Sequence, residues 1–463
     1  MRGVLLGWDT NQAIAYDKDA HILTIAQSGA GKNTSVIMPN LLTNAFKGSK
    51  IILDLKGENS AVCSYWKKTE KGGQSYRLNP WGIFDMESIR FNPFCTLDAY
   101  SDTLYEDCTA FAEAIIPEKI KQGDTGEHFD EMAREFIASF LMYLVILNRP
   151  VEGKLLKEVT PVNLYDELII RTSEVEDLKA LAKEMGELLH PDPYIKRALQ
   201  LSSITLKGIT GGGDNGEFRG IKTTLSKALK SFKSKVLAQT VDTTREKSLA
   251  IIDMLFHEGR DNNDLYISFP QSEMKTARVW LRLVLTAFIR DNIKNPPNRP
   301  VLFVLDEFPQ LGTFNLIKDN AAFLRGYHVR FWFIGQNIGQ FETNYGKAGM
   351  ETIFENCTVK QFFNISDSTA RYVSQKLGKQ SIIIKNLGTM EYRSTHVEDV
   401  MSQTEIERTD MVINFTGNNP AFFTVKRPYY KIPELAINAL PNPLIHGLPA
   451  FKKEVVKYLD FDK

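Results

Sequence analysis

Short apolar runs rich in β-branched residues recur along the chain and alternate with longer amphipathic stretches. The apolar runs cover residues 22–26, 50–55, 265–269, 300–305 and 329–334. Strands of a parallel sheet have this pattern when both faces of the sheet are covered, because neither face then meets water. The first two runs are separated by a loop and a helix-like stretch, which is the order of a β-loop-α-β unit. The pattern predicts an α/β fold with a mostly parallel sheet.

The middle of the chain, from about residue 96 to residue 257, has a different pattern. It contains few strand-like runs, and Gly and Pro residues mark the breaks between its amphipathic stretches. We interpret this region as a mostly helical domain inserted into the α/β domain. Its helices are expected over residues 104–115, 128–147, 174–189 and 220–238.

The inserted region divides the chain into four segments. Residues 1–95 and 258–435 are expected to form the first and second parts of the α/β domain, with the helical domain over 96–257. Residues 436–463, in which prolines recur, are expected to form an extended C-terminal tail. The longest apolar run, 136–147, is shorter than the roughly 20 residues that span a bilayer, so it predicts a buried helix in a soluble chain.

Opposite charges balance in this chain of 463 residues, with 56 Lys and Arg against 56 Asp and Glu. No overall positive field would therefore attract nucleic acid, and a DNA contact would need a local basic surface. The best basic stretch is Lys222, Lys227, Lys230, Lys233 and Lys235, of which 227, 230 and 233 are predicted to share one helical face. The alternative is that these lysines form a solvated helix face.

The four cysteines are scattered without a CxxC pair, which disfavours a disulfide framework or a zinc site.

Residues 26–34, Ala-Gln-Ser-Gly-Ala-Gly-Lys-Asn-Thr, have the composition and the position of a phosphate-binding P-loop. They follow the apolar run at 22–26 and precede an apolar helical start at 35–38. In such a loop glycines turn backbone N–H groups onto the phosphates, and Lys32 reaches the β- and γ-phosphates of ATP. The alternative is a Gly-rich turn with an incidental lysine. The predicted nucleotide-binding residues are Gln27, Ser28, Gly29, Ala30, Gly31, Lys32, Asn33 and Thr34.

Two positions depart from the usual P-loop pattern. Ala26 stands where the first glycine is expected, and Asn33 replaces the Ser or Thr that follows the lysine. A hydroxyl at that position normally ligates Mg²⁺. The metal ligand is therefore the Asn33 amide oxygen, or else Thr34 or a water takes its place.

A second motif closes the apolar run at 300–305 with two carboxylates, Asp306 and Glu307. In P-loop enzymes the first acid holds the Mg²⁺ shell, which assigns a metal role to Asp306. Glu307 is then placed to polarise the attacking water as a general base. A plain solvent-facing strand end is the alternative, and the presence of a P-loop in the same chain disfavours it.

Three further polar residues lie near the last apolar run. Gln336 follows the run at 329–334, where a polar side chain can sit between the γ-phosphate and the attacking water. It is a candidate sensor, with a surface glutamine as the alternative. Arg325 and Arg330 flank the preceding turn, and either is a candidate arginine finger for a neighbouring subunit, unless it is simply solvated.

The motifs around these residues resemble those of the type IV coupling proteins, the ATPases that recruit relaxosome DNA or effector proteins to a type IV secretion channel. The run LDEFPQLG with an upstream D-x-KGE is the most specific part, and the resemblance covers most of the chain. The matching segments are Asp54-Leu-Lys-Gly-Glu58, Leu78-Asn-Pro80, Phe91-Asn-Pro93, Leu305–Gly312, Phe333-Ile-Gly-Gln336 and Glu355-Asn-Cys357.

The resemblance implies a RecA-like P-loop nucleotide-binding domain, an inserted all-α domain and an ATP hydrolase that uses ATP and Mg²⁺. It implies a metal role for Asp306, a catalytic role for Glu307, and sensor or trans-finger roles for Gln336 and Arg325. The implied partners are relaxase–DNA complexes or secreted effectors, together with channel ATPases and inner-membrane components. The implied location is the cytoplasmic face of the bacterial inner membrane.

Family members usually begin with an N-terminal membrane anchor, whereas this chain opens almost at its first strands. The resemblance therefore implies either a trimmed chain or attachment through a partner. The expected states are a homohexamer when assembled and a monomer in isolation. Two other functions fit the same residues: a DNA translocase of the septum or export type, and a non-hydrolysing docking platform in which Ala26 and Asn33 mark a decayed site.

Overall fold

The computed structural model describes residues 3–68, 73–118, 124–150, 157–211, 216–257, 263–385 and 393–459. The chain forms two compact units. The first comprises Met1–Lys47, Leu302–Pro309 and Arg330–Lys463, and the second comprises Gly48–Val301 and Gln310–Val329. Within the described residues, no helix is both long enough and apolar enough to cross a membrane.

The core of the first unit is a mixed sheet. Strand β3 (His21–Ala26) pairs in parallel with β8 (Val329–Gly335) and β9 (Cys357–Phe363). All residues of β3 and β8 are buried, as are those of β7 (Val301–Leu305), which confirms the strands predicted there from fully apolar runs. Strand β12 is antiparallel to β9 and to β13. The order is β13 (Phe422–Thr424), β12 (Val412–Thr416), β9, β3, β8, β7.

His21, the first residue of β3, has a structural role. Its ring is buried, and its Nδ1 accepts a hydrogen bond of 2.9 Å from the backbone N–H of Phe331 on β8. On the same two strands, Trp332 Nε1 donates to Thr24 Oγ1 at 2.8 Å. These bonds provide partners for polar groups that are buried in the sheet.

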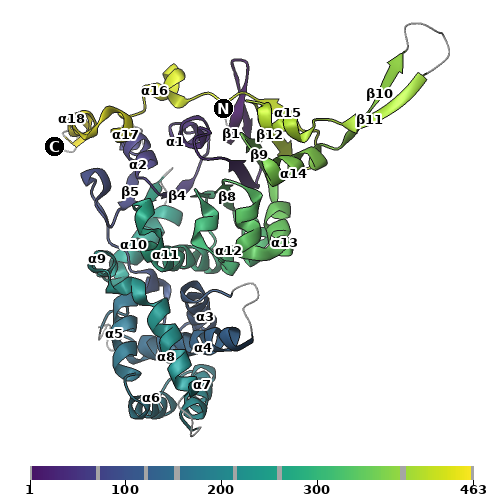
Figure 1. Cartoon of the computed structure of the whole chain (residues 1–463). Helices are drawn as coiled ribbons and strands as arrows, with labels where there is room; N and C mark the ends of the chain where they lie inside the picture. Colours follow the sequence, from purple (N-terminus) through teal and green to yellow (C-terminus); the bar gives the residue numbers. More distant parts are fainter. Residues whose placement is uncertain are drawn as a thin grey trace. The chain divides into compact units, whose positions relative to one another are not determined.

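Two hairpins belong to the first unit. One is formed by β1 (Val4–Asp9) and β2 (Gln12–Tyr16). The other is formed by β10 (Lys379–Lys385) and β11 (Arg393–Asp399), and it projects away from the helices beside it, as Figure 1 shows. The helices of this unit include α13 (Ile338–Asn356), α14 (Asp367–Leu377) and α15 (Gln403–Arg408).

The expectation of an extended C-terminal tail is wrong. Helices lie over much of residues 433–459, and the prolines within them stand in first turns rather than in the interior. Pro433 and Pro443 occupy first-turn positions, where the missing N–H has no intrahelical partner to lose. The helices are α16 (Pro433–Ala436), α17 (Pro443–His446) and α18 (Leu448–Leu459).

The second unit contains three parallel strands and a long helix. Strand β6 (Asp264–Ser268) lies between β4 (Ser49–Asp54) and β5 (Ser75–Leu78) and is parallel to both. This confirms the strands predicted at 50–55 and 265–269. Helix α11 (Met274–Lys294) is largely buried, including its large Trp280 side chain.

Between residues 104 and 256 the described elements of the second unit are helices and helical turns. Those predicted over 104–115, 128–147 and 174–189 are confirmed. These elements are α3 (Leu104–Ile115), α4 (Asp124–Leu147), α5 (Pro161–Arg171), α6 (Val175–Glu187), α7 (Pro193–Gly211), α8 (Gly216–Ala228), η5 (Lys230–Lys233), α9 (Lys235–Val241) and α10 (Arg245–Phe256).

The single helix predicted over 220–238 is wrong. Helix α8 ends at Ala228, and the 3₁₀ turn η5 separates it from α9. In a 3₁₀ turn, residues three apart point the same way, and here Leu229 and Phe232 are both buried. Burial of this pair interrupts the α-helix. Consequently Lys227, Lys230 and Lys233 do not share one α-helical face.

Asp54, at the end of β4, is fully buried. Its Oδ2 accepts a hydrogen bond of 2.7 Å from the backbone N–H of Ser60, and its Oδ1 accepts a longer one of 3.4 Å from Asn59 Nδ2. Burial outweighs these bonds and raises the pKa of Asp54 from 3.8 to about 7. The folded protein therefore binds a proton at this carboxyl more tightly than the unfolded chain does.

This raised pKa predicts a pH dependence of stability. The contribution of Asp54 is complete below pH 3.8 and is lost as pH rises through about 7. We expect the free energy of unfolding to fall by about 4 kcal/mol from this group across that window. Asp54→Asn should remove that part of the slope in urea titrations at several pH values, whereas Glu87→Gln, at an exposed position, should not. Equal slopes in the wild type and Asp54→Asn would contradict the prediction.

Candidate nucleotide site

The loop that follows β3 contains two glycines in the left-handed region. Gly29 has φ of 79° and Gly31 has φ of 82°. Other residues are strained there, so the loop needs glycine at both positions. A Cβ on Gly29 would meet no atom within 4 Å, so the loop has open space beside it. The backbone turns back tightly, with Ala30 N–H donating to Gln27 O at 3.2 Å and Ser35 N–H to Gly31 O at 2.9 Å.

A helical segment follows this loop, as expected, but its first turn is π-helical rather than α-helical. A π-helical turn, η1 (Asn33–Ile37), runs directly into α1 (Met38–Leu41), and Lys32 stands at the N-cap position. Thr34 Oγ1 donates to Gly31 O at 3.4 Å, which holds the side chain against the loop. The Gln27 side chain donates to Ser366 Oγ at 2.6 Å.

Three of the predicted site residues come together on one carboxylate oxygen. Lys32 Nζ lies 3.0 Å from Glu307 Oε1, and Gln336 Nε2 donates to the same atom at 3.1 Å. The Lys32 and Glu307 side chains are only 10% and 12% exposed, so water screens the pair weakly. All three residues belong to the first unit. Lys32, Glu307 and Gln336, which lie far apart in the sequence, thus meet in the folded chain.

The second oxygen of Glu307 is in a different environment. Among the described residues Oε2 is buried and has no hydrogen-bond partner. A buried carboxylate oxygen is costly without a donor or a cation, so this atom indicates a group that binds beside it. Asp306 is also buried at the end of β7. Two acidic side chains next to a glycine-rich loop with a lysine provide the oxygen ligands that Mg²⁺ prefers and the N–H groups that phosphates prefer.

The backbone of Glu307 is strained, with φ of 54°. A residue with a Cβ adopts this region only when its surroundings impose it. The following residues supply that constraint within the first unit. Phe308 is fully buried, with its ring stacked on Tyr345 at 6.0 Å and against Phe333 at 4.9 Å. Asn344 Nδ2 donates to Pro309 O at 2.6 Å. No local sequence pattern marks these supporting residues.

The two arginines considered as fingers differ in their surroundings. Arg330 is 7% exposed, forms an ion pair with Asp19 and lies over the Phe46 ring. Its guanidinium is therefore held inside its own chain, contrary to the expectation for a finger. Arg325 lies exposed at the end of α12 (Asn315–Arg325), in the second unit. Arg325 remains the candidate finger.

A parallel sheet with a glycine-rich loop after one strand and two adjacent acids after another has the arrangement of the P-loop class of nucleotide-binding proteins. The family model described as "Type IV secretory system Conjugative DNA transfer" matches residues 2–409. The chain belongs to this family, which confirms the resemblance drawn from its motifs.

Curated relatives and solved structures agree with this membership. The conjugal transfer protein TraG of Escherichia coli is 22% identical over 92% of this chain and 69% of its own length. The type IV secretion system-coupling protein VirD4 of Bartonella henselae is 24% identical over 78% of this chain and 53% of its own. The chain thus spans between about half and two thirds of these relatives. The plasmid coupling protein TrwB in complex with ADP and Mg²⁺ has a similar fold, with a TM-score of 0.62 at 15% identity, over 89% of this chain and 86% of that one.

The strained backbone of Glu307 gives a prediction that is independent of catalysis. Glu307→Gly and Glu307→Ala both remove the carboxylate and its contacts, and they differ only by a Cβ at φ of 54°. We expect the glycine variant to be more stable by about 1 kcal/mol in its free energy of unfolding. Urea unfolding of the two variants side by side measures this difference. An alanine variant that is equally stable would show that the backbone relaxes out of the left-handed region.

Proposed function

We propose that this chain is an ATP-hydrolysing coupling protein, which recruits relaxase–DNA complexes or effector proteins to a type IV secretion channel and drives their transfer. The observation that carries the proposal is the carboxylate of Glu307. It receives Lys32 and Gln336 on one oxygen and keeps the other buried and without a partner. A decayed docking platform has no reason to retain this arrangement together with a strained backbone.

The ion pair between Lys32 and Glu307 suggests how Glu307 is kept from activating a water before ATP binds. While Lys32 contacts Glu307, the lysine ammonium occupies one oxygen of the carboxylate, 3.0 Å away. A triphosphate that draws Lys32 toward its own oxygens leaves Glu307 free to orient and deprotonate a water. Gln336, bonded to the same oxygen, is then placed to sense the change. Bound Mg²⁺ would neutralise phosphate charge, with Asp306 and Asn33 as the residues that hold it.

The proposal also includes the domain organisation and the assembly of the protein. Residues 1–95 and 258–435 form a RecA-like nucleotide-binding domain, and residues 96–257 form an all-α domain that contacts substrates. The assembled protein is a homohexamer at the cytoplasmic face of the inner membrane, where it meets channel ATPases and membrane components. In this assembly Arg325 acts on the site of a neighbouring subunit.

The Glu307→Gln variant tests the catalytic assignment. It keeps the size of the side chain and can still contact Lys32 and Gln336, but it removes the base. We expect ATP binding within about threefold of the wild type and a loss of steady-state turnover of about 100-fold or more. Calorimetric titration and phosphate release measure the two quantities. Unchanged turnover would refute the role of Glu307, and the absence of Mg²⁺-dependent binding by the wild type would favour the docking platform.

Asn33 offers a test of the metal shell. If its amide oxygen is a ligand, Asn33→Ala should raise the Mg²⁺ concentration for half-maximal turnover by about tenfold. Asn33→Ser restores an oxygen ligand and should stay closer to the wild type. The control is Thr34→Val, whose hydroxyl already bonds to Gly31 O. A large effect of Thr34→Val with none of Asn33→Ala would transfer the ligand role to Thr34.

A further inference from the structure

Arg282 is a buried arginine that binds backbone carbonyls from two separate segments. It lies on α11 and is 4% exposed. Its Nε donates to Ala114 O at 2.6 Å and its Nη2 to Ile115 O at 3.3 Å, while its Nη1 donates to Leu311 O at 2.9 Å. The planar guanidinium fork thus joins the end of α3 to the chain that follows Asp306 and Glu307. All four residues belong to the second unit.

The backbone carbonyls at both segments are suited to binding the Arg282 guanidinium. Ala114 and Ile115 are in the last turn of α3, where helix carbonyls lack intrahelical donors and carry partial negative charge. Leu311 ends η7 (Phe308–Leu311), the 3₁₀ turn that begins one residue after Glu307. Burial of a guanidinium is costly, so the geometry is kept only if several of its N–H groups are satisfied.

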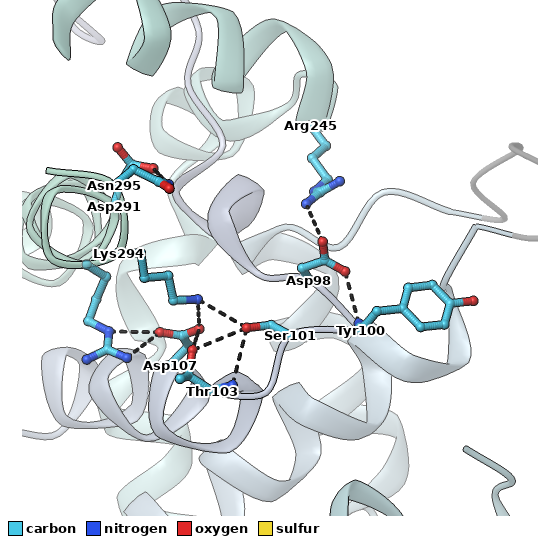
Figure 2. Close-up of polar contacts among 10 residues, drawn as sticks. Asp98, Tyr100, Ser101, Thr103, Asp107, Arg245, Asp291, Lys294 and Asn295 are labelled. Carbon is cyan, nitrogen blue, oxygen red and sulfur yellow. Dashed lines mark hydrogen bonds and ion pairs between the residues drawn. The ribbon is translucent and has the colours of Figure 1, made fainter. Parts of the chain in front are cut away.

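The other end of α3 is also bound to α11. Arg290 Nε donates to Asp107 Oδ1 at 2.8 Å, and Lys294 forms an ion pair with the same carboxylate. Thr103 Oγ1 adds a hydrogen bond to Asp107 Oδ2 at 3.2 Å. Figure 2 shows Lys294, Thr103 and Ser101 gathered around Asp107. Helix α3 is therefore anchored to α11 near both of its ends.

The turn η7 is therefore held at both of its ends. In the first unit, Phe308 is fixed by its aromatic neighbours and Pro309 O by Asn344. In the second unit, Leu311 O is fixed by Arg282. Leu311 follows the strained Glu307 by four positions in the sequence.

We propose that Arg282 is a positioning residue for Glu307 and that it links the helical segment beginning at α3 to ATP turnover. A ligand that displaces α3 acts on Glu307 through Arg282 and η7, without touching the nucleotide. The part that concerns turnover rests on the proposed ATPase function. The structural link between α3 and η7 does not.

Two substitutions of Arg282 test the link with turnover. Arg282→Met removes the hydrogen bonds to Ala114, Ile115 and Leu311, and we expect kcat to fall about 10- to 100-fold, because displacements near 1 Å have effects of that size. The KM for ATP and the Kd for ADP should stay within about twofold, since the P-loop is untouched. Arg282→Lys keeps the positive charge but not the planar guanidinium fork. Its kcat should therefore lie between those of the wild type and Arg282→Met.

The matched control is Arg278→Met. Arg278 lies one turn earlier on α11 and, like Arg282, close to Gly312, but its Nε has no hydrogen-bond partner among the described residues. This variant should leave kcat and KM near wild-type values. A folded Arg282→Met or Arg282→Lys protein with wild-type kcat overturns the proposal, as does a rise in KM with unchanged kcat.

Hydrogen–deuterium exchange tests the link without any need for ATPase activity. In Arg282→Lys, the amides of residues 308–312 and of the last turn of α3 should exchange faster together, by about tenfold, while Arg278→Met should match the wild type. Exchange that rises at only one of the two segments, or at neither, overturns the link itself. If the wild type lacks turnover but both segments respond, the proposed ATPase function fails and the link stands.

Discussion

The ion pair between Lys32 and Glu307 joins two segments that are 275 residues apart in sequence. Such a pair is stable in a poorly hydrated place only if both charges are held in good geometry and their remaining atoms are satisfied. Here the geometry comes from the sheet of the first unit, in which β3 and β7 lie on either side of β8. The residues that follow these three strands are Lys32, Gln336 and Glu307. The order of the strands is therefore what assembles the site, and the apolar strand residues serve mainly to fix that order.

Much of this arrangement was predictable from sequence. A strand buried on both faces must be apolar throughout, so polar residues directly after it are conspicuous, as Asp306, Glu307 and Gln336 are. The P-loop was predictable for a different reason, because left-handed backbone at Gly29 and Gly31 requires glycine. Both signals are local. They depend on the residues themselves and their immediate neighbours, not on the tertiary packing around them.

The features that the sequence did not reveal depend on tertiary contacts. Phe308 supports Glu307 by stacking on Tyr345, and aromatic residues in an apolar context carry no sign of which ring they will meet. Arg282 was missed because its partners are backbone carbonyls, which every residue has. The break after α8 was missed because the lysines fitted a helical face, while the burial of Leu229 and Phe232 determined the backbone. The C-terminal prolines were misread because proline breaks a helix interior but suits a helix start.

Strained backbone and buried charged groups destabilise the fold, and several of them lie at the ends of strands. Glu307 is strained after β7, and Asp54 is buried at the end of β4 with its pKa raised to about 7. At the start of β6, the Asp264 carboxylate faces two buried lysines, and burial lowers the pKa of Lys67 to about 7. An apolar residue at any of these positions would avoid the desolvation cost. Strain and buried charge persist where the surrounding structure is stable enough to impose them, and they concentrate at functional sites. For Glu307 the imposed conformation directs one carboxylate oxygen at Lys32 and Gln336 and leaves the other buried without a partner among the described residues, as the proposed catalytic role requires.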